Sequence, residues 1–444
     1  TNETDEALLD GVSIVDGSLG QNGIELAVTG HPLSPESIQE ITLLTSNYDA
    51  QYGYTSSSVM TAVTKSGTNQ FHGALYYLTH NSALNARPFG VDQRPKDIEN
   101  DFGGAIGGPI PLPIFSSGRK KSYFFVNYEG FRLRGSTSSP HYTVPTAQER
   151  NGDFSDWPAP IYDPETTRNN PNYNPNLPTG ANNLPVLRDQ FMGCDGHHPN
   201  VICSSDPRLV NSAASAWLKY LPQPNLPGVI ANYTPPTPVS STVNADSTVL
   251  DIRGDMYWRD VDHFTATIHY FGSFGNNQHV FPEQIASEGY RSPNYDYANR
   301  GNWDHTFRPN LINTFNIGYN DILSVILCVD AGQTGLPTIP GALNNTLPPQ
   351  LNFENYSGMG CNADGETTRP AWLLNDRLMW VKGKHTLSFG GEFRALQDKE
   401  RNEGNESGSY SFSSLNTGLR GIASGNDFAS FLLGYVGQAN LYVP

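Results

Sequence analysis

Several segments of this chain alternate apolar and polar side chains with a period of two, the pattern of β-strands that have two different faces. The clearest runs from His263 to Tyr270. Its apolar face carries Phe264, Ala266, Ile268 and Tyr270, and its polar face carries His263, Thr265, Thr267 and His269. Similar segments lie at 74–78, 124–129, 314–320 and 387–395. Such strands fit a membrane barrel with a lipid-facing and a water-facing side, and also a soluble sandwich.

The connections between these segments alternate between tight and long. We expect tight turns at Trp258–Asp260, Arg308–Asn310 and Lys382–Lys384, and longer connections at 109–121, 136–242, 275–294, 323–369 and 398–407. Loops longer than about 15 residues are uncommon in compact soluble domains. A meander with short turns at one end and long loops at the other is typical of outer-membrane barrels, so we predict a mainly β chain of about ten antiparallel, up-and-down transmembrane strands with long extracellular loops.

Charge argues against one other class of protein, and hydropathy excludes another. Lys and Arg number 27 and Asp and Glu number 43, a formal net charge of −16. This disfavours a nucleic-acid partner, which requires a basic face. The sequence contains no run of about 18 apolar residues that could form a transmembrane helix. Its 43 Gly, 33 Pro and 22 Tyr fit a loop-rich, aromatic β protein.

Four motifs resemble those of one known family. Residues 38–73 predict a strand, a connector, a second strand and a Gly-Thr-Asn turn within VTKSGTNQFHG. The other three are Leu8-Leu-Asp-Gly-Val12, Phe102-Gly-Gly-Ala-Ile-Gly-Gly-Pro-Ile110 and Thr143-Val-Pro-Thr-Ala-Gln-Glu-Arg-Asn-Gly-Asp-Phe154. In this order they resemble TonB-dependent outer-membrane receptors of the Oar-like branch. The resemblance implies that residues 1–69 are the C-terminal part of a plug domain. Residues 70–444 are then the N-terminal portion of a β-barrel, with a long outer loop at 136–242, and the chain is a fragment of a longer protein.

The resemblance also carries expectations about function. It implies a receptor or transporter in the bacterial outer membrane, in contact with membrane lipid, that moves a large or scarce ligand and is driven by a TonB-type energy-coupling protein. A glycan or a peptide is the ligand class that suits loops rich in Tyr, Trp and Asn; its binding residues are not identified. No enzyme activity and no cofactor are expected. The alternatives are a self-assembling extracellular adhesive β protein and a secreted carbohydrate-active protein.

The four cysteines are Cys194, Cys203, Cys328 and Cys361. An even, sparse set fits an oxidising compartment. If the first barrel strand begins near Gly73 and runs outward, Cys194 and Cys203 fall in one outer loop and Cys328 and Cys361 fall in another. Each pair can close within its own loop, so we predict the disulfides Cys194–Cys203 and Cys328–Cys361. Four unpaired thiols are the alternative.

Other residue clusters have a structural interpretation that we prefer to a chemical one. His197 and His198 between two cysteines suggest zinc, but the spacing matches no common zinc module. The Asp260–His263 and Asp304–His305 clusters suggest acid–base chemistry, but their place at strand ends favours turn capping and rim charge. The 362–366 segment lacks the full spacing of a calcium loop. We therefore expect no metal site and no catalytic residue.

Two helices are expected. Ser34-Pro35-Glu36 has the pattern of a helix start. A longer helix is predicted to begin at Asp206, with an apolar stripe of Leu209, Val210, Ala213, Ala214, Trp217, Leu218 and Leu221. We interpret this stripe as the core of a small unit within the long loop rather than as a partner-binding surface.

Overall fold

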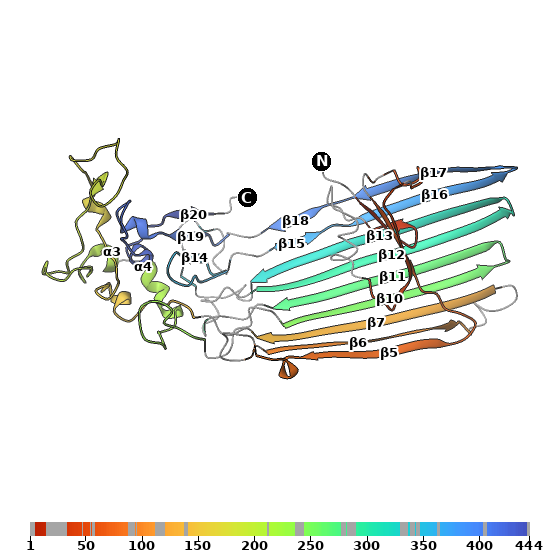
Figure 1. Cartoon of the computed structure of the whole chain (residues 1–444), viewed down its shortest axis with the longest axis horizontal. Helices are drawn as coiled ribbons and strands as arrows, with labels where there is room; N and C mark the ends of the chain where they lie inside the picture. The colour runs from red at the N-terminus through yellow and green to blue at the C-terminus, as the bar shows by residue number, and fades with distance from the viewer. Residues whose placement is uncertain are drawn as a thin grey trace.

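One large antiparallel sheet dominates the computed structural model (Figure 1). Its strands follow in the order β17-β16-β13-β12-β11-β10-β7-β6-β5, and β15 and β18 extend it beside β13. The bounds are β5 (His72–Asn81), β6 (Lys96–Pro109), β7 (Lys120–Ser136), β10 (Asn244–Trp258), β11 (Asp262–Asn276), β12 (Tyr290–Arg308), β13 (Leu311–Cys328), β15 (Gly365–Thr368), β16 (Ala371–Lys382), β17 (His385–Leu396) and β18 (Lys399–Asn402). The prediction of a mainly β, up-and-down antiparallel chain is confirmed.

The structure describes most of the chain. The described residues are 5–14, 33–46, 48–53, 55, 58–87, 94, 96–111, 120–136, 141–210, 213–235, 244–276, 281, 290–328, 336–337, 342, 347–361, 365–402 and 406–441. The 362–364 part of the calcium-like segment lies outside them. None of the helices in these ranges is long and apolar enough to cross a membrane.

The tight turns lie where the sequence predicts them, whereas several strands are longer than expected. Residues 259–261 join β10 to β11, 309–310 join β12 to β13, and 383–384 join β16 to β17. Arg259 and Asp260 both have positive φ angles, of 57° and 56°. At the opposite end, β11 and β12 extend into the 275–294 connection, and β18 occupies part of the 398–407 connection. We call these two ends of the sheet the turn end and the loop end.

The large sheet has a buried polar face and an exposed apolar face. On β11, Thr267 and His269 are 1% and 0% exposed, whereas Ile268 between them is 48% exposed. The buried polar groups pair with one another: His269 Nδ1 lies 2.6 Å from Asp251 Oδ1, and Asn127 Nδ2 donates to Asp251 Oδ2 at 3.1 Å. This polarity is the reverse of that of a soluble sandwich and matches strands that face lipid on one side.

A smaller N-terminal sheet packs against the buried polar face (Figure 1). Its order is β2-β1-β4-β3, with bounds β1 (Glu6–Leu9), β2 (Val12–Ser13), β3 (Ile38–Leu44) and β4 (Val59–Thr64). Its apolar core is small: Ala7, Leu9, Ile14 and Ala62 meet Ala298 of β12. The helix expected from Ser34 is wrong, because residues 35–37 form only a turn in which Ser37 N donates to Ser34 O.

At the loop end, three chain segments build a third unit, here called the distal domain: residues 141–235, 347–361 and 406–441 (Figure 1). Its elements are η3 (Glu149–Asn151), η4 (Pro164–Thr166), β8 (Arg168–Asn169), β9 (Val186–Leu187), α3 (Pro207–Val210), η5 (Ala213–Ala216), η6 (Leu218–Tyr220), β14 (Gln350–Phe353), β19 (Ser409–Phe412), η8 (Ser414–Asn416), α4 (Asp427–Leu432) and β20 (Gln438–Asn440). One apolar core unites the three segments.

The continuous helix predicted from Asp206 is also wrong. The chain forms one α-helical turn, α3, and two 3₁₀ turns, η5 and η6, over the described part of this segment. Ala214, Trp217 and Leu221 are nevertheless buried in the distal core, whereas Val210 is 62% exposed. The stripe therefore contributes to a core, as predicted, but that core is not confined to the long loop, because it includes residues of the 347–361 and 406–441 segments. The helical period is not kept, since contacts with these distant segments decide the backbone path.

Candidate functional site: a polar seam and a distal domain

The N-terminal sheet touches the large sheet through a set of hydrogen bonds and ion pairs that we call the polar seam. It starts at the β1–β2 hairpin, where Asp10 and Gly11 form a two-residue turn with φ angles of 49° and 81°. Asp-Gly is a favoured pair for such turns, because both residues tolerate positive φ. The turn brings the Asp10 carboxylate to the large sheet, where Oδ2 accepts a hydrogen bond from Thr267 Oγ1 at 3.0 Å.

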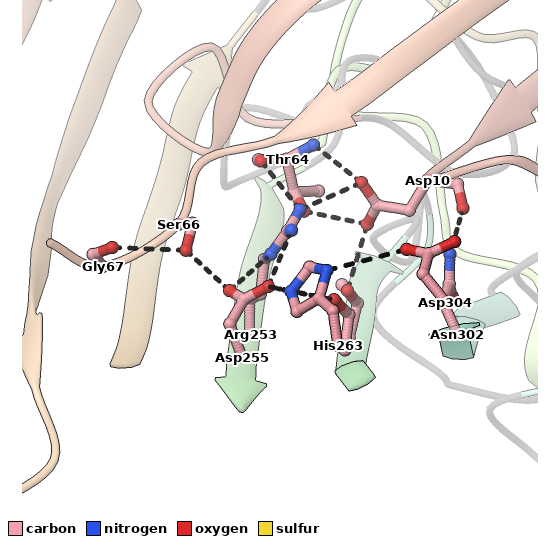
Figure 2. A network of polar contacts seen from close by, with 11 residues as sticks. Asp10, Thr64, Ser66, Gly67, Arg253, Asp255, His263, Asn302 and Asp304 are labelled. Atoms are coloured by element: carbon pink, nitrogen blue, oxygen red, sulfur yellow. Dashed lines mark hydrogen bonds and ion pairs between the residues drawn. The ribbon is translucent and has the colours of Figure 1, made fainter. Parts of the chain in front are cut away.

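Arg253 of β10 is the hub of the seam (Figure 2). Its Nε and Nη2 donate to the two carboxylate oxygens of Asp255, each at 2.9 Å. Its Nη1 donates to Thr64 O at 3.0 Å and lies 3.3 Å from Asp10 Oδ1. The side chains of Asp10 and Asp255 are 4% and 1% exposed. The guanidinium group therefore compensates two buried carboxylates, one from each sheet.

Residues 65–67, which follow β4, pack closely against the large sheet. Ser66 Oγ donates to Asp255 Oδ2 at 2.6 Å (Figure 2). A Cβ at Gly67 would lie 2.3 Å from the Phe124 carbonyl oxygen and 2.7 Å from that of Gly108, so only glycine fits. The Lys-Ser-Gly part of the motif thus has a physical reason: serine binds the sheet and glycine permits the close approach.

Further contacts distribute the seam over most of the large sheet. Ser34 Oγ donates to Glu129 Oε2 at 2.7 Å, Asn302 Nδ2 donates to Asp10 O at 2.7 Å, and Asn320 Nδ2 donates to Ser13 O at 3.0 Å. At β17, Arg394 Nη2 lies 3.1 Å from Glu6 Oε1. The N-terminal sheet is therefore held mainly by polar bonds. Two small apolar contacts add to them, one at Ala298 and one where Val12 meets Ala371 and Leu373 of β16.

The acid and histidine clusters at the turn end divide between the two faces. His263 lies on the inner face, with Nε2 3.1 Å from Asp255 Oδ1 and Nδ1 3.6 Å from Asp304 Oδ2 (Figure 2). His305 Nδ1 instead lies 2.6 Å from Asp262 Oδ1, which also accepts from Trp303 Nε1. All of these residues were expected from the sequence to cap turns or to supply rim charge. The structure shows in addition that His263 and Asp304 support the seam, and the period of two had already placed His263 on the polar face.

Two arginine side chains, Arg208 and Arg188, hold segments of the distal domain together, and we call their contacts the arginine clasps. Arg208 Nη1 and Nη2 donate to Asp163 at 2.7 and 2.9 Å, and Nη2 also donates to Asp206 at 2.6 Å. These bonds raise the pKa of Arg208 and lower the pKa of Asp206. Arg188 Nη1 donates to the carbonyls of Asn416 and Gly418 at 2.9 and 2.7 Å. The Arg188 bonds join segments 228 and 230 residues apart, whereas Arg208 and Asp163 are 45 residues apart. No local sequence pattern indicates either contact.

The Thr143–Phe154 motif has a structural role in this domain. Glu149 Oε2 accepts from Thr146 N at 2.7 Å while Thr146 Oγ1 accepts from Glu149 N at 3.2 Å, a capping box. Arg150 Nη1 donates to Leu218 O at 2.9 Å, and Phe154 is fully buried. The motif therefore contributes to the distal core and does not indicate a catalytic or metal-binding site.

Burial of Glu149 makes the stability of the distal domain depend on pH. Loss of water raises the pKa of Glu149, against the hydrogen bond that Tyr356 donates to it at 2.6 Å. Since the folded-state pKa lies above the unfolded value of about 4.3, the folded protein holds the proton more tightly. This contribution to stability is full below the unfolded pKa and is lost as the pH rises through the folded one.

We therefore expect Glu149→Gln to flatten the dependence of the distal-domain melting temperature on pH above about 4.5. The measurement is near-ultraviolet circular dichroism, which reports on Trp157 stacked against Tyr356. Melting curves of the wild type and the variant that stay parallel across this range contradict the assignment.

The structure contains both disulfides that the loop positions predict, Cys194–Cys203 and Cys328–Cys361. Cys328 at the end of β13 and Cys361 are buried with Leu347. A disulfide that spans 33 residues stabilises a fold by about 2–4 kcal/mol, because it restricts the unfolded chain. We expect the double variant Cys328→Ala/Cys361→Ala to lose stability by this amount in a denaturant titration. A peptide map of the unreduced protein checks the pairing, and cross-loop pairs or free thiols contradict it.

The described part of the chain brings together one group of three side chains that could ligate a metal: His80, Asp97 and Glu99. His197 and His198 are not among them. His198 Nε2 instead lies 3.2 Å from Asp195 Oδ2 on an exposed loop. The zinc interpretation of that loop therefore gains no support.

One family of known proteins matches most of the chain. The family described as outer membrane β-barrel domain matches residues 63–443. The chain belongs to this family. It is thus an outer-membrane β-barrel chain, as the alternation of tight turns and long loops predicts, and its exposed apolar face is the lipid-facing one.

Individual relatives of this outer-membrane β-barrel chain are transporters and receptors, not enzymes. It is 31% identical to the TonB-dependent transporter Oar of Myxococcus xanthus over 105 residues, 22% of this chain and 10% of that protein. The outer membrane transporter YddB of Escherichia coli has a TM-score of 0.47 at 11% identity, covering 93% of this chain and 43% of YddB. The ferric enterobactin receptor PfeA of Pseudomonas aeruginosa has a TM-score of 0.34 at 10% identity, covering 90% and 51%. The chain spans about half or less of each relative.

Proposed function

We propose that the chain is part of a TonB-dependent outer-membrane receptor. Residues 1–69 are the C-terminal part of the plug, and residues 70–444 are the N-terminal portion of the barrel, with the long outer loop at 136–242. The observation that carries this proposal is the polar seam: the N-terminal sheet occupies the inner side of the barrel wall and is attached by hydrogen bonds and ion pairs. When a mechanical pull separates the two sheets, hydrogen bonds to water replace the polar bonds that are broken.

The distal domain is the proposed ligand-binding part. It stands at the loop end, which faces the outside of the cell in barrels of this family. Its core and its arginine clasps make it a pre-organised surface rather than a loose loop, which lowers the entropic cost of binding. A glycan or a peptide is the proposed ligand class, and a TonB-type protein is the proposed energy-coupling partner.

Permeability tests the plug assignment. The variant is the parent protein from which every residue before Ser66 has been deleted. Because a large barrel without its plug has an open lumen, we expect this variant to make the outer membrane permeable to vancomycin. The control is the full-length protein at equal abundance, and the change in gel mobility on heating verifies barrel assembly. An assembled barrel that still excludes vancomycin contradicts the assignment.

Crosslinking tests the partner. Formaldehyde added to intact cells is expected to join the full-length parent protein to the TonB-type protein, and a strain that lacks this protein serves as the control. A crosslinked species that persists in the control strain, or none in the wild type, counts against energised transport.

A further inference from the structure

The two faces of the β6–β10 wall carry opposite charges near the loop end. Glu129 of β7 faces inward, because it accepts a hydrogen bond from Ser34 of the N-terminal sheet. Neighbouring residues alternate, so Tyr128 and Arg132 face outward. The inward acidic groups are Asp97, Glu99, Asp101 and Glu129. The outward charged groups are Lys96, Arg132, Arg134 and Asp246, which we call the exterior basic patch. It holds three cations and one carboxylate in a chain of net charge −16.

The patch lies on the loop-end side of a row of outward-facing side chains that are mostly aromatic. Tyr128 pairs with Leu250, Leu250 pairs with Tyr270, and Tyr270 pairs with Tyr297 across successive strands. The rings of Tyr270 and Tyr297 are 5.5 Å apart. Aromatic rows of this kind mark the boundary between hydrocarbon and headgroups.

The distance from this row places the patch in the headgroup layer. Arg132 is four residues beyond Tyr128 on β7, which corresponds to about 13 Å along the strand. With a strand tilt of about 40°, this is roughly 10 Å along the membrane normal. Since the loop end faces outward, the patch lies among the headgroups of the outer leaflet.

The two guanidinium groups are held in place and share one carboxylate. Arg134 Nη2 donates to Asp246 Oδ2 at 3.1 Å, and Arg132 Nε is 4.0 Å from Asp246 Oδ1. Arg132 Nη1 donates to the carbonyls of Phe131 and Ser247, both at 2.7 Å, and its Cζ stands 5.6 Å from the Phe102 ring centre. The Arg132 and Arg134 side chains remain 30% and 41% exposed. Because the two guanidinium groups share one carboxylate, they keep an excess of positive charge. Their planar groups have the geometry that binds phosphate.

We propose that the exterior basic patch binds the phosphate groups of a phosphorylated glycolipid of the outer leaflet, of the lipid A type. Arg132 and Arg134 contact the phosphates, and Lys96 adds charge beside them on the neighbouring strand. The acyl chains lie along the exposed apolar wall below, which includes Tyr128 and Ile106. A ligand in the lumen is no alternative occupant, because the patch is on the other side of the wall.

Native mass spectrometry of the full-length parent protein tests this proposal. The delipidated protein is titrated with bisphosphorylated lipid A, with dephosphorylated lipid A, and with bisphosphorylated lipid A in millimolar inorganic phosphate. The variant is Arg132→Gln/Arg134→Gln, with Arg134→Gln alone as a milder substitution if the double variant fails to assemble. The matched control is Arg168→Gln, which removes an exposed arginine that pairs with Asp189 in the distal domain.

We expect the dissociation constant for bisphosphorylated lipid A to rise about tenfold or more in the double variant, a change of about 1.4 kcal/mol. The control is expected to bind as the wild type does, and dephosphorylated lipid A is expected to bind the wild type about tenfold more weakly. Equal affinity of wild type and double variant overturns the proposal, as does equal affinity for the two lipids. Complete displacement by inorganic phosphate overturns the assignment to a lipid and identifies a free-phosphate site.

Discussion

Arg253→Ala is expected to release the N-terminal sheet from the barrel wall. The substitution leaves the buried carboxylates of Asp10 and Asp255 without their shared cation. Removal of one partner from a buried ion pair costs about 3–5 kcal/mol. Amide hydrogen exchange in β1 and β4, measured by mass spectrometry on the full-length protein in detergent, is expected to accelerate by about a hundredfold to a few thousandfold, since each 1.4 kcal/mol is a factor of ten.

Two control variants test whether the faster exchange is specific to the loss of the Arg253 guanidinium group. Arg253→Lys keeps the charge but loses the paired bonds to Asp255, so we expect intermediate exchange. Arg168→Ala removes an exposed ion pair of the distal domain, and exposed pairs contribute about 0–1 kcal/mol. Exchange in β10 and β11 is expected to stay slow in all variants. Unchanged protection of β1 in Arg253→Ala contradicts the role of Arg253 as the hub of the seam.

Phe428→Ala is expected to unfold the distal domain at a much lower temperature. Phe428 of α4 is fully buried, and its ring centre lies 5.2 Å from that of Tyr356 and 5.6 Å from that of Phe431. Truncation of such a ring costs about 3–5 kcal/mol, because it removes apolar contacts and leaves a cavity. For a unit of this size, the melting temperature falls by about 6–20 °C. Near-ultraviolet circular dichroism reports the transition through Trp157.

The control for this variant is Leu415→Ala. Leu415 lies in the same domain but is 57% exposed, so its truncation is expected to change stability by about 0.5 kcal/mol or less. Assembly of the barrel, followed by gel mobility with and without heating, is expected to remain normal in both variants. A melting temperature of Phe428→Ala equal to that of Leu415→Ala contradicts the view that α4 is a central core element.

The strand pattern was predictable because it is local. The period of two between His263 and Tyr270 assigned each side chain to a face, and the tight turns followed from short polar connections between such segments. The two helices were predicted wrongly for the opposite reason. Residues 35–37 and 206–221 have local helix signals, but their backbones are decided by contacts with distant segments.

The sequence by itself determined the alternating strands, the tight turns and the family motifs, because these depend on neighbouring residues. Only the tertiary structure decided which polar groups meet. Asp10 and Arg253 are 243 residues apart, and Trp157 Nε1 donates to Gly425 O across 268 residues. No local pattern encodes such pairs, because sheet register and loop packing create them. The polar seam, the distal domain and the exterior basic patch therefore became visible only in the folded chain.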